Sequence, residues 1–193
     1  KNNGYFVDEI DFDFVYFIVP AYYVLTTAEA SSNLSRYDGI RYGYSAKDQQ
    51  EDLTTFYKKN RGKGFGKEVK KRIMLGTFVL SEGYFDAYFT KAQQVRNLLV
   101  QRTKEIFNNF DAVLLPTVPA TALEAGAMNK DPIAVYLADI YTVYANLTGL
   151  PAISLPLFKH SNGMPFGVQL LTKKDKELTL LEFSNFLMQN HKH

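Results

Sequence analysis

Arg72 and Asp139 are two charged side chains whose chemistry suits the binding of a small charged ligand. Arg72 ends the basic run Lys70-Lys71-Arg72 in a predicted helix, where composition alone favours a solvated helix face. A planar guanidinium can also give a carboxylate two parallel N–H bonds, which an ammonium cannot. Asp139 lies in the otherwise apolar stretch IAVYLADIYTVY, where a lone carboxylate is costly to bury without a cation or hydrogen-bond donors. From that residue alone, a structural hydrogen-bond role and a binding role are equally open.

Hydroxyl groups are the next candidates for chemistry. Tyr22 and Tyr23 are adjacent in a predicted helix and point about 100° apart, so only one of them can line a given pocket. Core packing is the alternative for each tyrosine. Ser31 and Ser32 lie in an Ala-rich helical pattern that favours close packing, and Ser154 alternates within an apolar strand, which favours a structural role.

No pattern in the sequence indicates a metal or nucleotide site. The chain has no cysteine, which excludes disulfides, thiolate metal sites and a cysteine nucleophile. His160, His191 and His193 do not have the spacing of metal ligands. The glycines of GKGFG (62–66) lack the Lys–Ser/Thr ending of a phosphate-binding loop and are interpreted as helix breakers. We therefore expect no metal and no cofactor in this chain.

The composition is that of a globular protein, with 193 residues, 46% apolar and 22% charged. The net charge of +2 does not argue for a nucleic-acid-binding surface, which needs Lys and Arg clustered on one face. No apolar run reaches the roughly 18 residues that span a bilayer, and no signal peptide is visible, so a cytoplasmic location is expected. The chain opens at Lys1, so we expect a truncated start, and a signal or further domain upstream stays open.

Hydrophobic periodicity and glycine positions predict helices in the first part of the chain, at residues 21–34, 47–60, 67–81 and 85–110. An aromatic run at 12–19, stopped by Pro20, fits either a strand or a helix end, and 35–46 is expected to be a loop. The helix from Phe85 should carry one apolar stripe over about seven turns.

Strands are predicted in the second part, at residues 111–116, 152–158 and 166–171, the last two pairing as a hairpin around a turn at 161–165. A helix should run from near Asp131 to a cap at Gly149. A last helix, 176–190, should present an apolar face of Leu178, Leu181, Phe183, Phe186 and Leu187. The predicted class is α/β, with helices packed around a mixed β-sheet. About three strands are few for a complete sheet, so the fold should be incomplete in this chain.

Five stretches carry a family resemblance: VPAYYVLTTAEASSNLSRYDGIRYG (19–43), GFGKEVKKRIMLGTFVLSEGYFDAYFTKAQQVR (64–96), DAVLLPTVPATA (111–122), DPIAVYLADIYTVYANLTGLPAISLP (131–156) and NGMPFGVQLL (162–171). In this order they resemble the A subunits of the tRNA-dependent amidotransferases, the glutamyl-tRNA(Gln) and aspartyl-tRNA(Asn) enzymes of the amidase-signature family. EASSNLSRYDGIRYG and KEVKKRIMLGT look particular to these A subunits. The resemblance implies that residues 1–193 form the C-terminal part of a single amidase-signature domain, without its N-terminal catalytic part.

The resemblance also implies an amide-hydrolysing chemistry. Enzymes of this family use a Ser nucleophile, a bridging Ser and a Lys base around a Gly/Ser-rich segment, because a hydroxyl is a weak nucleophile until a base takes its proton. Backbone N–H groups of that segment would hold the oxyanion. None of the eight serines of this chain lies in such a segment. We therefore expect no catalytic residue in this chain, and no activity from it in isolation.

What the chain should supply is part of a glutamine pocket. By match to the family, Arg72 receives the α-carboxylate of glutamine, Asp139 receives its α-ammonium, and Tyr22 is the favoured pocket tyrosine. An Arg for the carboxylate and an Asp for the ammonium form the minimal recognition pair for a free amino acid.

The resemblance implies a whole enzyme of the glutamine-hydrolysing glutaminyl-tRNA synthase type. It would hydrolyse glutamine, pass ammonia to a B subunit, and amidate mis-acylated Glu-tRNA(Gln) or Asp-tRNA(Asn) with ATP and Mg²⁺. The B and C subunits would be its partners, with tRNA bound mainly by the B subunit and no membrane involved. One alternative is a stand-alone amidase-signature hydrolase of another amide. Another is a non-enzymatic folding or interaction module. The isolated chain is expected to expose apolar surface and self-associate.

Overall fold

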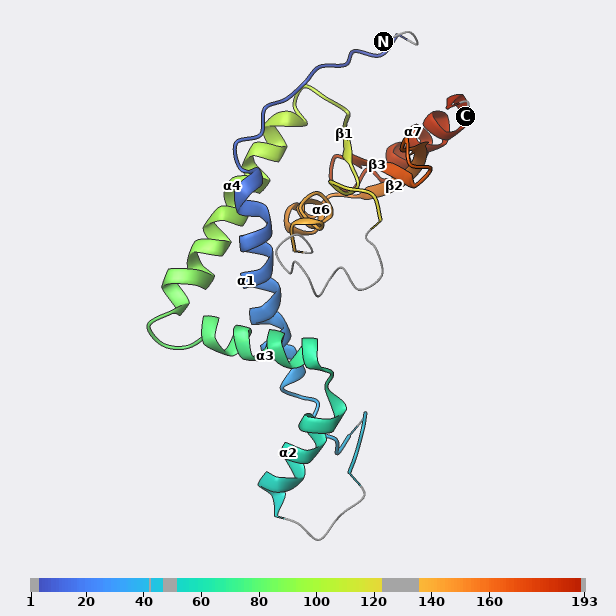
Figure 1. Cartoon of the computed structure of the whole chain (residues 1–193). Coiled ribbons are helices and arrows are strands. Elements are labelled where there is room, and N and C mark those ends of the chain that lie inside the picture. Colours follow the sequence, from blue (N-terminus) through green and yellow to red (C-terminus); the bar gives the residue numbers. More distant parts are fainter. Residues whose placement is uncertain (1–3, 42, 47–51, 123–135, 192–193) are drawn as a thin grey trace. The chain divides into compact units, whose positions relative to one another are not determined.

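The computed structural model describes residues 4–41, 43–46, 52–122 and 136–191, and it divides into two compact units. The sheet unit joins Lys1–Pro20 to Arg96–His193, and the helical unit is Ala21–Val95. The elements (Figure 1) are α1 (Val15–Leu34), α2 (Leu53–Gly64), α3 (Lys67–Val79), a π turn (Asp86–Thr90), α4 (Lys91–Ile106), β1 (Ala112–Pro116), α6 (Thr142–Thr148), β2 (Ala152–Lys159), β3 (Pro165–Thr172) and α7 (Glu177–Asn190). The α/β class is confirmed. The assignment of 1–193 to one domain stays a prediction.

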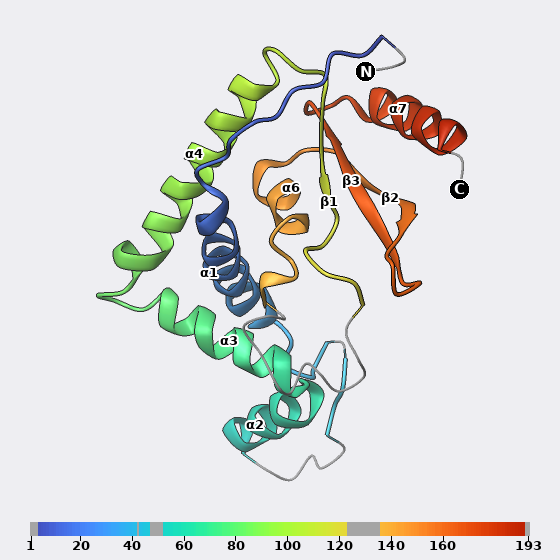
Figure 2. The same ribbon diagram turned by 45° about the horizontal axis from the view of Figure 1, so that its top comes forward.

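Close approach of α1 and α3 builds the helical unit. A Cβ atom on Gly76 of α3 would overlap the carbonyl oxygen of Thr27 in α1, so only glycine lets the two backbones come this close. The hydroxyls of Ser31 and Thr77 form a hydrogen bond at the same contact, with 2.9 Å between the oxygens. Figures 1 and 2 show α3 crossing the C-terminal part of α1. This contact confirms the predicted small-residue helix and the packing role of Ser31.

A buried amide fastens the loop 35–46 to α2. The Asn60 side chain is 3% exposed; its Oδ1 accepts from the backbone N–H of Ala46 at 2.6 Å, and its Nδ2 donates to the carbonyl of Asp38 at 3.0 Å. Gly39 has φ 86°, and a side chain there would collide with the Asn60 amide. The predicted loop is confirmed in its described residues.

The N-terminus of α2 is set by a carboxylate cap. Asp52 accepts from the backbone N–H groups of Thr54 and Thr55, at 3.0 and 3.1 Å. The hydrogen bond from the Thr55 hydroxyl, with those from the backbone, holds the pKa of Asp52 below its usual range. The helix was expected from residue 47, and residues 47–51 lie outside the described part of the chain.

The sheet unit is built on three antiparallel strands in the order β1-β3-β2 (Figure 2). The predicted hairpin is confirmed, with Ile153 opposite Leu170 and Leu155 opposite Val168. α6 ends at Gly149, whose φ of 70° matches the predicted glycine cap. Among the described helices, none is both long and apolar enough to cross a bilayer.

α7 packs on this sheet with a face that matches the predicted one at Phe183 and Leu187 but not at Leu178 and Leu181. Leu180 of α7 is 5% exposed and belongs to a buried cluster with Leu155, Leu157 and Leu170, against which Phe183 and Leu187 pack. Leu178 and Leu181, placed on the buried face by the sequence, are 70% and 56% exposed. The true face follows an i, i+3, i+4, i+7 pattern through Ser184, a polar residue that masked it. The Ser184 hydroxyl donates to the Leu180 carbonyl at 2.6 Å and is thereby satisfied within the helix.

Two helix predictions fail for identifiable reasons. Pro20 was expected to stop the aromatic run, yet α1 begins at Val15 and continues through it. Proline removes the N–H that would bond to the carbonyl of Tyr16, and Tyr16 is 82% exposed, so water can satisfy that carbonyl. The helix expected from Phe85 opens with the π turn Asp86–Thr90 and becomes α-helical at Lys91. Phe85, Tyr88 and Leu98 of the predicted stripe are 41%, 43% and 47% exposed, so the stripe does not form one buried face.

Candidate substrate-binding site

Arg72 lies in the first half of α3, on the helical unit. Its Nε donates to Oε1 of Glu68, one turn earlier, at 3.3 Å. Its guanidinium carbon lies 5.9 Å from the centroid of the Tyr23 ring, within the range of a cation–π contact. The side chain is 41% exposed, so a carboxylate from solvent can reach it. The Glu68 carboxylate and the Tyr23 ring contact the guanidinium from two sides, and these contacts restrict its orientation.

Tyr23, and not Tyr22, is the tyrosine whose ring lies beside this guanidinium. The Tyr22 ring meets the Tyr23 ring nearly edge-on, with centroids 5.5 Å apart and an interplanar angle of 84°. The sequence indicated that only one of the two could face a given group, but it could not show which, because the choice depends on where α3 crosses α1. The assignment of Tyr22 to the pocket stays a prediction, and Tyr23 joins it as a candidate on geometry.

Asp139 lies in a turn of the sheet unit, which corrects the prediction that it sits within a helix. Residues 138–141 form this turn directly before α6. The Asp139 carbonyl accepts from the backbone N–H of Val143 at 3.0 Å and from the hydroxyl of Thr142 at 3.1 Å, so it opens the first turn of α6. The residue is exposed. The cost of burying a lone carboxylate, which the sequence suggested, therefore does not arise. The predicted helix start near Asp131 lies outside the described residues.

A buried glutamine ties the Asp139 turn to the sheet. Gln169 of β3 is 4% exposed, and its Nε2 donates to the carbonyl of Tyr141 at 3.2 Å, two residues after Asp139. A buried amide left unpaired would be costly, so this bond holds the turn against the strand. Sequence reasoning missed Gln169, although a polar residue inside the apolar run FGVQLL was a visible signal.

The predicted site residues thus fall in different units. Arg72, Tyr22 and Tyr23 belong to the helical unit, and Asp139 belongs to the sheet unit. The Arg72 guanidinium is partly exposed and is held by Glu68 and Tyr23, and Asp139 is exposed. A guanidinium suits a carboxylate, and an exposed carboxylate suits an ammonium.

The hydroxyls of three serines serve packing. The Ser31 hydroxyl bonds across α1 and α3, the Ser154 hydroxyl lies 2.9 Å from that of Thr117, and the Ser184 hydroxyl bonds within α7. These contacts agree with the structural roles expected for Ser31 and Ser154. Among the described residues, no group of three or more His, Cys, Asp or Glu could hold a metal ion.

Comparison with known proteins decides the family. The model of the amidase family matches residues 1–181. This chain belongs to the amidase family. It is 49% identical over 181 residues to the A subunit of glutamyl-tRNA(Gln) amidotransferase from Agathobacter rectalis, covering 94% of this chain and 36% of that protein. Against the corresponding A subunit from Pseudomonas putida strain F1 it is 48% identical over 186 residues, covering 96% of this chain and 38% of the relative. This amidase-family chain therefore spans just over a third of the length of these curated relatives.

Solved amidase structures agree with the fold. The crystal structure of the glutamyl-tRNA(Gln) amidotransferase A subunit from Thermotoga maritima superposes with a TM-score of 0.65 at 38% identity, covering 94% of this chain and 34% of that one. A 6-aminohexanoate cyclic dimer hydrolase superposes with a TM-score of 0.66 at 17% identity over the whole of this chain and 39% of its own, which shows the shared fold alone. The fold is therefore that of part of an amidase-signature enzyme.

Proposed function

We propose that this chain is part of the A subunit of a tRNA-dependent amidotransferase and that it supplies part of the glutamine pocket. The observation that carries the proposal is the 48–49% identity to the A subunits of glutamyl-tRNA(Gln) amidotransferases over nearly the whole chain. The names of these relatives favour Glu-tRNA(Gln) over Asp-tRNA(Asn) as the substrate of the assembly.

In this proposal the work is divided among parts of a larger enzyme. The Ser/Lys catalytic set lies in a part of the A subunit outside this chain, and it hydrolyses glutamine. Ammonia then passes to the B subunit, which uses ATP and Mg²⁺ to amidate the glutamyl-tRNA, with the C subunit completing a cytoplasmic complex. The residues of the present chain bind and orient the substrate.

Orientation is what the Arg72 and Asp139 pair contributes. Glutamine is a small zwitterion whose reacting amide lies at the far end from its two charges. Holding the α-carboxylate on Arg72 and the α-ammonium on Asp139 fixes where that amide points, so remote binding energy becomes alignment at the nucleophile. The contacts of Arg72 with Glu68 and Tyr23 would keep the guanidinium in place before glutamine arrives.

The test compares glutamine with ammonium as nitrogen donor for tRNA amidation by the assembled full-length enzyme. Arg72→Lys keeps the charge but loses the bidentate fork, and Asp139→Asn keeps the shape but loses the charge. Each variant lacks a charge-assisted contact worth roughly 1.5–3 kcal/mol, so kcat/KM for glutamine should fall about 10- to 150-fold. Amidation with ammonium should be unchanged, because ammonia needs no glutamine site. If both donors lose activity equally, these residues support the fold and the assignment is wrong.

A tyrosine pair supplies a matched control. Tyr22→Leu and Tyr23→Leu each remove one aromatic ring from adjacent positions of α1. The Tyr23 ring is the one that contacts the Arg72 guanidinium, so we expect that Tyr23→Leu raises KM for glutamine and that Tyr22→Leu does not. If the Tyr22 variant raises KM and the Tyr23 variant does not, Tyr22 is the pocket tyrosine, as the sequence predicts. Parallel assays on alkyl and aryl amides would separate a glutaminase from a hydrolase of other amides, which has no need of the α-amino-acid pair.

A further inference from the structure

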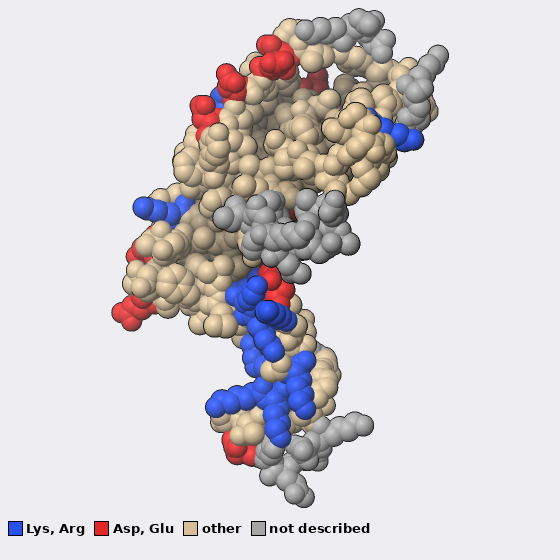
Figure 3. Space-filling model, viewed as in Figure 1, with Lys and Arg blue, Asp and Glu red and all other residues tan. Residues whose placement is uncertain are grey.

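Positive charge is concentrated in one short segment of the helical unit. Residues 53–72, which form α2 and the first half of α3, carry eight Lys and Arg against one Glu, a net charge of +7. The whole chain has a net charge of +2, so the remaining residues have fourteen Lys and Arg against nineteen Asp and Glu, a net charge of −5. Figure 3 shows the Lys and Arg side chains gathered over this part of the helical unit. The net charge of the chain conceals this segregation.

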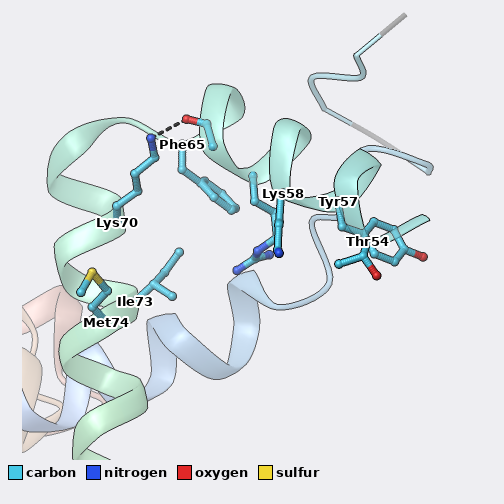
Figure 4. Close-up of a pocket in the computed structure, with 9 residues that line it drawn as sticks. Thr54, Tyr57, Lys58, Phe65, Lys70, Ile73 and Met74 are labelled. Atoms are coloured by element: carbon cyan, nitrogen blue, oxygen red, sulfur yellow. Dashed lines mark hydrogen bonds between the residues drawn. The ribbon is translucent and has the colours of Figure 1, made fainter. Parts of the chain in front are cut away.

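Three of these cations converge on an open groove between α2 and α3. Lys58 and Arg61 of α2 and Lys70 of α3 line it, together with the aromatic rings of Tyr57 and Phe65 (Figure 4). The groove has a volume of about 490 Å³, and none of its lining residues is acidic. Cations beside accessible rings suit a ligand that combines anionic groups with flat apolar ones.

Arg61 is held in the groove wall by its own contacts. Its Nη1 donates to the carbonyls of Leu34 and Tyr37, at 2.8 and 3.2 Å, and its guanidinium carbon lies 5.1 Å from the centroid of the Phe65 ring. Lys70 donates across the groove to the carbonyl of Gly62. These partners are neutral, so neither contact offsets the positive charge of the side chain.

The single acid of the segment does not neutralise the groove. Glu68 lies one turn from Arg72 and also 3.9 Å from Lys71, and these two cations are outside the groove. Lys58, Lys63 and Lys67 are exposed. Five cations thus supply positive charge at the groove or beside it in the sequence: Lys58, Arg61, Lys63, Lys67 and Lys70. The Asp52 carboxylate caps the start of α2, just outside this segment.

We propose that this α2–α3 surface binds the phosphate backbone of RNA. Lysine is depleted at protein–protein interfaces, whereas flexible ammonium groups are well suited to phosphates, which they bind as point charges. The rings of Tyr57 and Phe65 offer faces on which an unpaired base can stack. The inference does not rest on the glutamine site, because no residue of that site belongs to the five cations. A tRNA is used only as the RNA probe of the experiment.

The experiment measures the Kd of a labelled tRNA(Gln) transcript for the full chain as a function of salt. The variant Lys58→Glu/Lys63→Glu/Lys67→Glu changes only exposed lysines. Its Kd should rise about 10- to 100-fold at low salt, and the slope of log Kd against log salt should fall by about 2 to 3, roughly one for each lysine that no longer neutralises a phosphate. Circular dichroism confirms that the variant is folded.

A matched variant controls for general charge. Lys159→Glu/Lys173→Glu/Lys174→Glu reverses three lysines that are equally exposed but lie on the sheet unit. It should change the Kd less than about threefold and leave most of the salt slope, because it removes long-range attraction but no phosphate contact. Equal losses in the two variants would overturn the proposal. So would an unchanged Kd together with loss of binding to the partner subunits, which would assign the surface to an acidic protein.

Photo-crosslinking keeps the proposal testable without a change of sequence. Ultraviolet irradiation of the tRNA complex followed by peptide mass spectrometry should place crosslinks on Tyr57 or Phe65. Crosslinks confined to the sheet unit would overturn the assignment. Lys58, Lys63 and Lys67 take no part in the proposed glutamine pocket. Failure of the RNA-binding proposal would therefore leave the proposed glutamine site untouched, and failure of the glutamine site would leave the RNA-binding proposal untouched.

Discussion

The helical unit and the sheet unit of this chain bury different kinds of side chain. In the described part of the helical unit, the well-buried residues are small or polar, including Thr27, Ala28, Asn60, Gly76 and Val79. In the sheet unit they are mostly larger and aliphatic, including Leu99, Leu155, Leu157, Leu170 and Leu171. Close backbone approach and polar bonds hold the first unit, and apolar volume removed from water holds the second. The helical unit should therefore be sensitive to added atoms, and the sheet unit to removed ones.

The largest expected effect is on the sheet unit. Leu171→Ala removes most of a side chain that is fully buried in β3. The lost burial and the cavity left behind should lower the free energy of unfolding by about 2–5 kcal/mol. Urea denaturation measures the loss, and hydrogen exchange of β3 peptides locates it. A loss below about 1 kcal/mol would show that the sheet unit is not held by apolar volume.

The converse change in the helical unit adds a single methyl group. Gly76→Ala places a Cβ against the Thr27 carbonyl oxygen, so α1 and α3 must move apart, and the cost should be about 1–3 kcal/mol. Gly62→Ala is the matched control: this helical glycine has open space around it, and alanine should stabilise α2 by about 0.5–1 kcal/mol. Urea denaturation should give opposite signs for the two variants. The same sign would mean that helix propensity, and not backbone approach, governs this unit.

A smaller effect, with its own pH dependence, comes from a buried hydroxyl pair in the sheet unit. The Tyr144 and Thr103 oxygens lie 2.6 Å apart, and burial raises the pKa of Tyr144 above 10.0. Tyr144→Phe loses this bond, at about 1 kcal/mol. The unfolded tyrosine ionises first, so the native chain should lose stability as pH rises above about 10, and the phenylalanine variant should lack that component.

Urea denaturation from about pH 8 to about pH 11, a range that spans the ordinary pKa of tyrosine, measures the difference between the two chains. Tyr16→Phe is the control, since Tyr16 is 82% exposed and its replacement should change the free energy of unfolding at the lower pH by less than about 0.5 kcal/mol. Parallel pH profiles for the native chain and Tyr144→Phe would contradict the assigned role of burial.

The smallest expected change in stability accompanies a change in association. Leu178 and Leu181 lie on the exposed side of α7, so replacing both with serine should alter the free energy of unfolding by less than about 1 kcal/mol. If this exposed apolar face drives the predicted self-association of the chain, the double variant should sediment as a smaller species. The paired change Leu180→Ser should instead unfold the sheet unit, because Leu180 is buried. Identical sedimentation of the native chain and the double variant would remove α7 as the associating face.

Sequence reasoning succeeded where local patterns were unambiguous. The Gly66 boundary and the run KEVKKRIMLGT marked α3. Gly149 marked the end of α6, because the left-handed conformation there favours glycine. It failed where tertiary contacts decide. The buried face of α7 passes through Ser184, whose hydroxyl is satisfied inside the helix, and Pro20 is tolerated because the carbonyl it orphans lies at the surface.

The candidate site shows the same limit. The match to the family, and not the residue types alone, predicts a carboxylate partner for position 72 and an ammonium partner for position 139. The sequence could not show that Tyr23 faces Arg72, that Asp139 stands in an exposed turn, or that Gln169 anchors this turn. Each of these depends on the packing of segments far apart in the chain.

The π turn at Asp86–Thr90 has a meaning for how this family should be aligned. A π turn holds one more residue than the α-helical turn it replaces, so it is the mark of a one-residue insertion that a helix has absorbed. A relative without it would show a single-residue gap in the first turn of this helix. Forcing the alignment through without a gap would shift the residues before the turn by one position relative to those of α4. Substitutions upstream of Asp86 should therefore be compared between relatives only after this gap has been placed.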